Sequence, residues 1–234
     1  MIGKLEYGAS VITYDVERVH RKTLGLYVHP DGSVLVKAPN STTDDQICEK
    51  VHRRAAWILK QQHFFKSFGN GSLPKRYVGG ESHLYLGRQY MLRVTQSETD
   101  SVHYQNNIIE ISCQRREDAG ELMKEWYRVR AHQKFAEYAK PLINRFERYG
   151  VQPSGLEIRE MHARWGSCTS QGKIILNVEL IRAPKVCIEY VLIHELCHLV
   201  HRNHTKAYYE LLDKEMPHWQ RWKTRLEQIG PSIL

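Results

Sequence analysis

The sequence lacks several features that would assign this chain of 234 residues to a membrane or to a disulfide-bonded secreted fold. No stretch approaches the 18 apolar residues that span a bilayer, and the first residues contain no apolar segment of the signal-peptide type. The five cysteines are odd in number and include no Cys-x-x-Cys pair, which argues against a disulfide framework and against a thiolate zinc knuckle. We therefore expect a globular protein of the cytoplasm with no membrane partner.

The charge balance is positive, with 34 Lys and Arg against 26 Asp and Glu and a net charge of +8. Such a balance attracts nucleic acid, nucleotides or acidic surfaces. The basic residues are dispersed in small groups, without a long basic run or an aromatic-basic RNA-binding signature. Nucleic acid as a partner is therefore compatible with the charge but is indicated by no motif, and no feature defines an oligomeric state.

The chain begins with a β-rich region. Apolar alternation predicts strands over residues 11–19, 24–29 and 33–38, with a turn at residues 30–32. Thr43 and Gln46 have the spacing of a capping box, and helical spacing follows to about residue 68. A Gly- and Pro-containing break is expected at 69–74, and an antiparallel pair of strands at 83–94 and 102–112.

A long helix is expected to open the second half of the chain. Apolar spacing runs from about residue 118 to 149, with a kink or break near Pro141 and a C-terminal cap at Gly150. We place a boundary near residue 116, which gives an N-terminal β-rich module with one helix at 1–115 and a second module at 116–234. The expected class is α+β, with a small antiparallel sheet in the first module.

The second module contains a short helix that is apolar on nearly every face. Pro184 is suited to the start of this helix, and a final helix with Trp219 and Trp222 is expected to cover the module. Strands are predicted at 156–159 and 173–177. The strand at 173–177 either borders a cleft with a free edge or lies inside the sheet, and Trp165 either lines that cleft or belongs to the core.

The most informative segment is His-Glu-Leu-Cys-His at 194–198, followed by a further histidine at His204. Residues four apart on a helix lie one turn above each other, so His194 and His198 can bind one metal ion together. Glu195 then lies beside the open coordination position, where its carboxylate can take a proton from a water molecule. Chance supplies about 0.06 such motifs in a chain of this composition, and about 0.003 with the further histidine. We therefore predict a metal site, with Zn²⁺ as the ion.

The third ligand has several candidates. His201 lies on the same helix face as His194, but it is about 10 Å away along the axis. If the helix ends just after His201 and the chain reverses, His204 returns toward the metal. Asn203 favours this reversal, because asparagine tolerates the left-handed conformation that ends helices. We predict that His204 is the ligand. The alternatives are two carboxylates of the following helix, Glu210 and Asp213.

Several motifs around the histidines occur together in one known family. They are Trp-Gly-Ser-Cys at 165–168, residues 175–177, Pro184, Tyr190-Val191, the 194–198 motif and Asn203-His204. The combination covers about residues 161–216, with a similar element at 21–23, and resembles the YgjP-like metallopeptidase-domain family, which is related to SprT-like and other zincin hydrolases. The resemblance implies a zincin-like module in which His194, His198 and His204 bind zinc and Glu195 is the catalytic base. Tyr208-Tyr209 stands where many members have Phe-Trp.

The resemblance leaves two substrate classes open. The family name implies peptide hydrolysis, whereas some members are described as hydrolysing nucleoside triphosphates, notably UTP to UMP and pyrophosphate. Both reactions need an activated water and a Lewis acid. We expect a zinc-dependent hydrolase of metallopeptidase type that acts on a peptide. The alternatives are a nucleoside triphosphate pyrophosphohydrolase and, from a different class, a nucleic-acid-associated binding module with structural zinc.

Overall fold

The computed structural model describes residues 2–8, 10–21, 23–29, 32–67, 75–161 and 164–230. Sheets and helices follow one another in separate blocks along the chain, which confirms the α+β class. No helix among these residues is long and apolar enough to cross a membrane. The predicted break at 69–74 and the Pro30-Asp31 part of the predicted turn lie outside the described residues.

The first unit combines a four-stranded sheet with one helix. Its elements are β1 (Ile2–Tyr7), β2 (Ser10–Val19), β3 (Gly25–Val28), β4 (Val34–Pro39) and α1 (Asp44–Ser67). The strand order is β1-β2-β4-β3, and the inner strands β2 and β4 are parallel. The sheet is therefore mixed, rather than antiparallel as expected. The predicted capping box is confirmed, because the Thr43 N–H donates to Gln46 Oε1 at 3.0 Å and the Gln46 N–H donates to Thr43 Oγ1 at 3.3 Å.

The second unit begins with another four-stranded sheet, of order β5-β6-β8-β7. The strands are β5 (Ser82–Tyr85), β6 (Arg88–Gln96), β7 (Ser101–Gln105) and β8 (Ile108–Cys113). The prediction of one antiparallel pair here is wrong, because each predicted strand is itself a hairpin. The turn residues Leu86-Gly87 and Asn106-Asn107 all have positive φ, as two-residue hairpin turns require. The inner strands β6 and β8 then pair in parallel.

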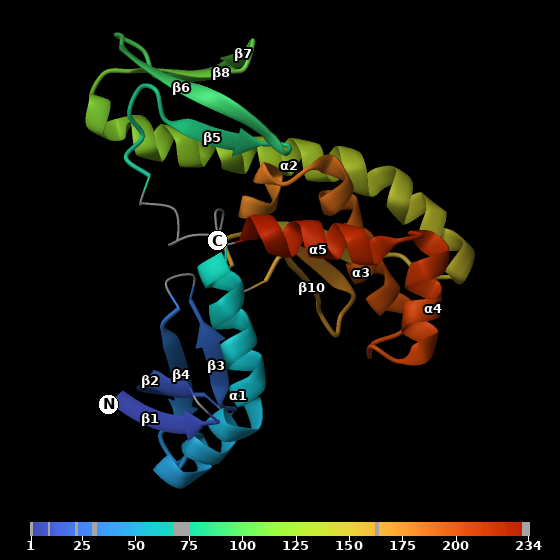
Figure 1. Cartoon of the computed structure of the whole chain (residues 1–234). Coiled ribbons are helices and arrows are strands. Elements are labelled where there is room, and N and C mark those ends of the chain that lie inside the picture. The colour runs from blue at the N-terminus through green and yellow to red at the C-terminus, as the bar shows by residue number, and fades with distance from the viewer. Residues whose placement is uncertain are drawn as a thin grey trace. The chain divides into compact units, whose positions relative to one another are not determined.

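The first unit and the first part of the second unit share one topology, although the sequence shows no internal repeat. Each has two antiparallel hairpins joined through parallel inner strands, followed by a helix that packs on the sheet. In the second unit this helix is α2 (Ala119–Phe146), which runs along the β5–β8 sheet (Figure 1). Pro141 lies within α2 without ending it, and Gly150 adopts the left-handed conformation of a C-terminal cap, as predicted.

The compact units are residues 1–74 and 75–233, which differs from the expected division at 115/116. The first hairpin of the second sheet gives the reason. The Leu86 and Gly87 N–H groups donate to carbonyls of the 3₁₀ helix η3 (Val178–Arg182) at 2.9 and 3.0 Å. A Cβ at Gly87 would lie 2.9 Å from Pro184 Cα, so glycine permits this close approach. Residues 75–115 thus pack against the start of the histidine-bearing helix.

The remaining elements of the second unit surround one central helix. They are β9 (Gly155–Arg159), β10 (Gly166–Cys168), β11 (Lys173–Asn177), α3 (Lys185–Val200), α4 (Lys206–Glu215) and α5 (Trp219–Ile229), with short 3₁₀ turns η1 (Arg116–Asp118) and η2 (Glu147–Tyr149) on either side of α2. Helix α3 contacts β10, α2, α4 and α5. Its apolar side chains are buried on several faces, as predicted.

A buried carboxylate joins the ends of α2 and α4. The Glu215 side chain is 1% exposed, and one of its oxygens lies 3.0 Å from Arg145 Nε. Arg148 and the Tyr149 hydroxyl donate to the other oxygen. Arg145 also donates to the Glu215 backbone carbonyl at 3.1 Å. Charge-assisted hydrogen bonds of this kind are strong, so α4 is held at its C-terminus.

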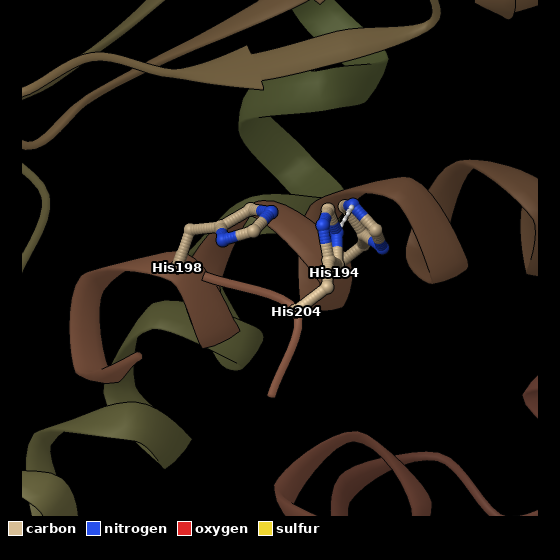
Figure 2. A group of neighbouring side chains, drawn as sticks. All are labelled: His194, His198 and His204. Atoms are coloured by element: carbon tan, nitrogen blue, oxygen red, sulfur yellow. Dashed lines mark hydrogen bonds between the residues drawn. The ribbon is translucent and has the colours of Figure 1, made fainter. Parts of the chain in front are cut away.

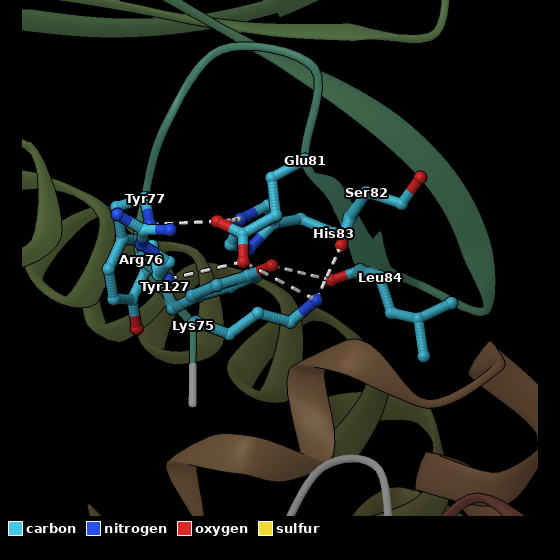
Figure 3. Close-up of polar contacts among 8 residues, drawn as sticks. All are labelled: Lys75, Arg76, Tyr77, Glu81, Ser82, His83, Leu84 and Tyr127. Carbon is cyan, nitrogen blue, oxygen red and sulfur yellow. Dashed lines mark hydrogen bonds and ion pairs between the residues drawn. The ribbon is translucent and has the colours of Figure 1, made fainter. Parts of the chain in front are cut away.

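A second polar network organises the start of the second unit (Figure 3). The Glu81 carboxylate accepts hydrogen bonds from the N–H groups of Arg76 at 3.2 Å and Tyr77 at 2.7 Å, and it lies 3.3 Å from His83 Nε2. Lys75 Nζ lies 4.0 Å from the same carboxylate. His83 is buried and its ring stacks on Tyr77. These contacts hold the segment that leads into β5.

Candidate metal centre

Three imidazole rings meet beside α3 (Figure 2). His194 and His198 project from α3, and His204 comes from the loop that precedes α4. One ring nitrogen of each residue lies within 4.8 Å of the other two, and His194 Nε2 is 3.3 Å from His204 Nε2. Two ligand atoms that each lie about 2.1 Å from a tetrahedral metal ion are about 3.4 Å from each other. The geometry is therefore suited to one shared metal ion.

The other candidates for third ligand lie outside this cluster. Asp213 accepts a hydrogen bond from Trp219 Nε1 at 2.7 Å, and the Glu210 side chain is exposed. His201 takes part through its backbone carbonyl, which accepts a hydrogen bond from His198. Of the residues weighed from the sequence, the structure thus brings only His204 to the pair on α3.

The chain reversal after α3 differs in detail from the prediction. Asn203 does not adopt the left-handed conformation expected of it. Instead, His201 ends the helix in an extended conformation, with φ of −128° and ψ of 104°. The Asn203 carbonyl then accepts a hydrogen bond from the Thr205 N–H at 2.7 Å, and the Thr205 side chain caps α4. The chain therefore reverses through extended backbone at His201 and the Thr205 N-cap, without a left-handed conformation at Asn203.

Burial keeps the histidines of α3 neutral. It is the main cause that lowers the pKa of His194 to about 3, with further contributions from His198 and His204. Burial also lowers the pKa of His198, although the hydrogen bond to the His201 carbonyl acts in the opposite direction. In that bond His198 Nδ1 donates at 3.2 Å, which leaves the lone pair on Nε2. Metal ions bind neutral imidazole, so these residues are prepared as ligands.

Glu195 lies between α3 and β10 and is 5% exposed. Burial raises the pKa of its carboxyl to about 7, while the charge of Arg164 and the Cys168 N–H lower it. The close approach of β10 depends on Gly166, where a Cβ would lie 2.9 Å from Glu195 Oε1 and 2.8 Å from Val191 Cγ1. A carboxyl that titrates near neutrality can accept a proton and return it.

The Tyr208 ring packs against all three histidine rings. It is fully buried, and its ring centroid lies 4.7 Å from those of His198 and His204. Its hydroxyl donates to the His194 backbone carbonyl at 3.2 Å. The first turn of α4 is therefore fixed against α3, although the sequence identified Tyr208 only as a departure from the family pattern.

The histidines and Glu195 face a cleft of about 710 Å³. A smaller cavity of about 210 Å³ adjoins it and shares Gly166, His194 and Glu195 with it. The strand that borders the cleft is β10, which lies at the edge of its sheet. Residues 173–177 form β11, which pairs with β10 on one side and β9 on the other. Of the two alternatives for this strand, the structure therefore shows the interior one.

The family model of the YgjP-like metallopeptidase domain matches residues 22–229. The chain belongs to this family. The match extends well beyond the 161–216 segment that carries the recognisable motifs. No curated protein matches the chain. Among solved structures, the metallopeptidase zymogen of Pyrococcus abyssi abylysin is similar at 20% identity and a TM-score of 0.35, over 44% of this chain and 99% of that one.

Membership of the YgjP-like family supports a metal-dependent hydrolase and implies a divalent metal ion. The residues fit such an ion, because three imidazoles converge and the space beside them opens into the cleft. His194, His198 and His204 are the residues that would hold it. Three protein ligands with an open position are typical of catalytic rather than structural zinc.

Three further residues of this YgjP-like site could not be assigned a role from the sequence, although Asn177 lies in the 175–177 motif. The buried Asn177 amide donates to the carbonyls of Met161 and Arg164 at 2.7 and 2.9 Å, which fixes the strand that enters the site. Arg164 and Arg202 line the cleft. The signal for Asn177 was a polar residue at the end of an apolar strand, whereas nothing local distinguishes the two arginines from other surface arginines.

Proposed function

We propose that this YgjP-like domain is a zinc-dependent peptidase in which His194, His198 and His204 hold the ion and Glu195 is the catalytic base. The proposal depends chiefly on one observation. Three imidazoles and a buried carboxylate face the same cleft, from α3 and the loop that follows it. Structural zinc would need no such carboxylate and no open position.

The chain's own residues account for the proton transfers. When bound, zinc supplies a Lewis acid that acidifies water and polarises a carbonyl. Glu195 accepts a proton from the attacking water and returns it to the leaving amine, which suits a pKa near 7. The His201 carbonyl holds the proton of His198 on Nδ1, so that Nε2 stays free to bind the ion.

Two features favour a peptide as the substrate. The edge strand β10 borders the cleft, and an extended peptide can add to such an edge through main-chain hydrogen bonds. The smaller cavity beside Glu195 has walls formed by Trp165, Tyr190 and Leu226, which suit an apolar side chain. A nucleoside triphosphate, the competing substrate, needs several cationic contacts, and among the described residues the cleft offers two guanidiniums besides its histidines.

The test uses the zinc-loaded full chain with a peptide library, UTP and nucleic acid in parallel, and Glu195→Gln as the matched control. We expect new peptide termini by mass spectrometry with the wild type and none with the variant. If pyrophosphate is released from UTP while the peptides stay intact, the proposed function must change from a peptidase to a pyrophosphohydrolase. Salt-dependent nucleic-acid binding by both proteins, without hydrolysis, would favour the structural-zinc module.

A further inference from the structure

The two cavities meet at the proposed base but lie toward opposite ends of α3. Both are lined by Gly166, His194 and Glu195. The smaller cavity continues along α3 to Tyr190, whereas the larger cleft continues to His198 and beyond. A substrate that crosses Glu195 therefore places one of its ends in each cavity. The residues that line each cavity determine which substrate side chains bind there.

The larger cleft has a cationic wall. Among the described residues that line it, Glu195 is the only acid, while Arg164 and Arg202 contribute two guanidiniums. Neither arginine forms an ion pair with a carboxylate in the described part of the chain. Arg202 is oriented by the hydrogen bond of its Nη2 to the Ser170 carbonyl at 3.1 Å. The cleft thus presents two guanidinium groups that form no direct ion pair, although the charge of Arg164 also acts on the Glu195 carboxyl.

The smaller cavity is apolar. Its walls include Trp165, Tyr190 and Leu226, and besides the shared Glu195 its described lining has one cation and one anion, Lys223 and Glu227. Lys223 Nζ lies 3.9 Å from the Glu227 carboxylate, so the two charges offset each other. Such a cavity favours an uncharged apolar side chain, because an additional charge would lose hydration without gaining a partner.

We propose that the peptide substrate carries an acidic side chain in the larger cleft, where Arg164 and Arg202 bind it, and an apolar side chain in the smaller cavity. This proposal rests on the proposed peptidase function and specifies its substrate class. Guanidinium groups bind carboxylates through strong paired hydrogen bonds, and burial of an apolar side chain supplies the second contact.

Strand β10 gives the substrate its direction. The strand runs from Gly166, which both cavities share, to Cys168 in the larger cleft. Antiparallel pairing is the more stable mode of strand addition, so the substrate runs from the larger cleft toward the smaller cavity. The acidic residue therefore precedes the cleaved bond and the apolar residue follows it. Water adds across that C–N bond and gives a new carboxylate and a new amine.

The experiment compares kcat/KM for matched peptides that contain Glu-Leu, Gln-Leu, Glu-Ala or Leu-Glu at one position. We expect Glu-Leu to exceed each of the others by about tenfold or more. Arg164→Gln and Arg202→Gln should each abolish most of the Glu over Gln preference, and Leu226→Trp should favour Glu-Ala over Glu-Leu. Arg221→Gln, on α5 outside both cavities, is the control and should change none of these ratios.

A binding measurement separates recognition from turnover. In the Glu195→Gln background, the Kd for an uncleaved Glu-Leu peptide should rise about tenfold with Arg202→Gln and should be unchanged with Arg221→Gln. Cleavage of all four peptides at similar rates would overturn the specificity proposal and leave the peptidase standing. Cleavage of no peptide by the wild type would overturn both.

Discussion

His194 Nε2 lies 3.3 Å from His204 Nε2, although ten positions separate the two residues. Two imidazoles can share one hydrogen bond across this gap, but a cation between them would use a lone pair of each. The loop after α3 is therefore as important to the candidate site as the helix itself. The Thr205 cap of α4 and the Tyr208 ring hold this loop in place.

Replacement of His204 by alanine should reduce zinc binding sharply, because two imidazoles alone are left to hold the ion. We expect an increase in Kd of at least about 100-fold, measured by competition with a chromogenic chelator. His201→Ala is the matched control, since it lies in the same loop and contributes only a backbone carbonyl. Equal zinc affinity of the two variants would move the third ligand away from His204.

The Glu195→Gln variant should keep zinc and lose turnover. Glutamine has nearly the same shape but cannot accept the proton, so kcat should fall by about 10²–10⁴-fold. Metal content by elemental analysis should match the wild type. Glu210→Gln on the exposed face of α4 is the control and should retain full activity. A Glu195→Gln enzyme with normal kcat would show that another group acts as the base.

The chemistry of this site could be predicted from the sequence because it depends on helical spacing. Residues 194–198 need only one regular helix to place two imidazoles and a carboxylate together. The prediction of His204 depended on a reversal of the chain after α3. The structure contains this reversal, but without the left-handed conformation expected at Asn203. The local backbone geometry of the reversal could thus not be predicted, even where the sequence named the three histidines that the structure brings together.

The topology of the sheets could not be predicted from local sequence patterns. The Asn106-Asn107 pair is a turn signal that divides the predicted strand at 102–112, but Leu86-Gly87 is weaker, because leucine rarely adopts positive φ. The parallel pairing of β6 with β8 is a long-range choice that alternation does not encode. The unit boundary also depends on a long-range contact, because the approach of Gly87 to Pro184 joins segments far apart in the sequence.

Gly166→Ala should separate β10 from α3. The added Cβ would meet Val191 and the Glu195 carboxylate at 2.8 and 2.9 Å, so the strand or the carboxylate must move. We expect a loss of stability of about 1–3 kcal/mol in urea unfolding and a larger proportional loss of kcat. Gly155→Ala, in the same sheet with open space around it, should leave both close to wild type. Similar behaviour of the two variants would contradict the close approach.

Glu215→Gln should destabilise the second unit. Removal of one partner from a buried ion pair costs about 3–5 kcal/mol, and the lower end applies here because Arg145 and Arg148 are partly in contact with water. Chemical unfolding of the full chain measures the loss. Glu210→Gln, an exposed residue of the same helix, should cost less than about 0.5 kcal/mol. A comparable small loss for Glu215→Gln would mean that the network does not hold α4.

Glu81→Gln should alter the pH dependence of stability. Burial raises the pKa of Glu81, but hydrogen bonds from the Arg76 and Tyr77 N–H groups, together with His83, lower it overall. Because the folded-state pKa lies below the unfolded one, the ionised carboxylate stabilises the fold above about pH 4, and this contribution is lost as the pH falls through the folded pKa. The variant should therefore be about 1–2 kcal/mol less stable at pH 7, and the difference should shrink toward pH 3.

Urea unfolding of both proteins between pH 7 and pH 3 measures this difference directly. His83 also destabilises the fold as the pH falls, because burial lowers its pKa, but it does so in both proteins. Because Glu81 also raises the pKa of His83, the comparison between wild type and variant measures Glu81 together with its coupling to His83. Glu98→Gln, an exposed residue of the same unit, controls for the loss of one negative charge. A difference between wild type and Glu81→Gln that stays constant with pH would mean that the backbone N–H groups do not favour the ionised carboxylate.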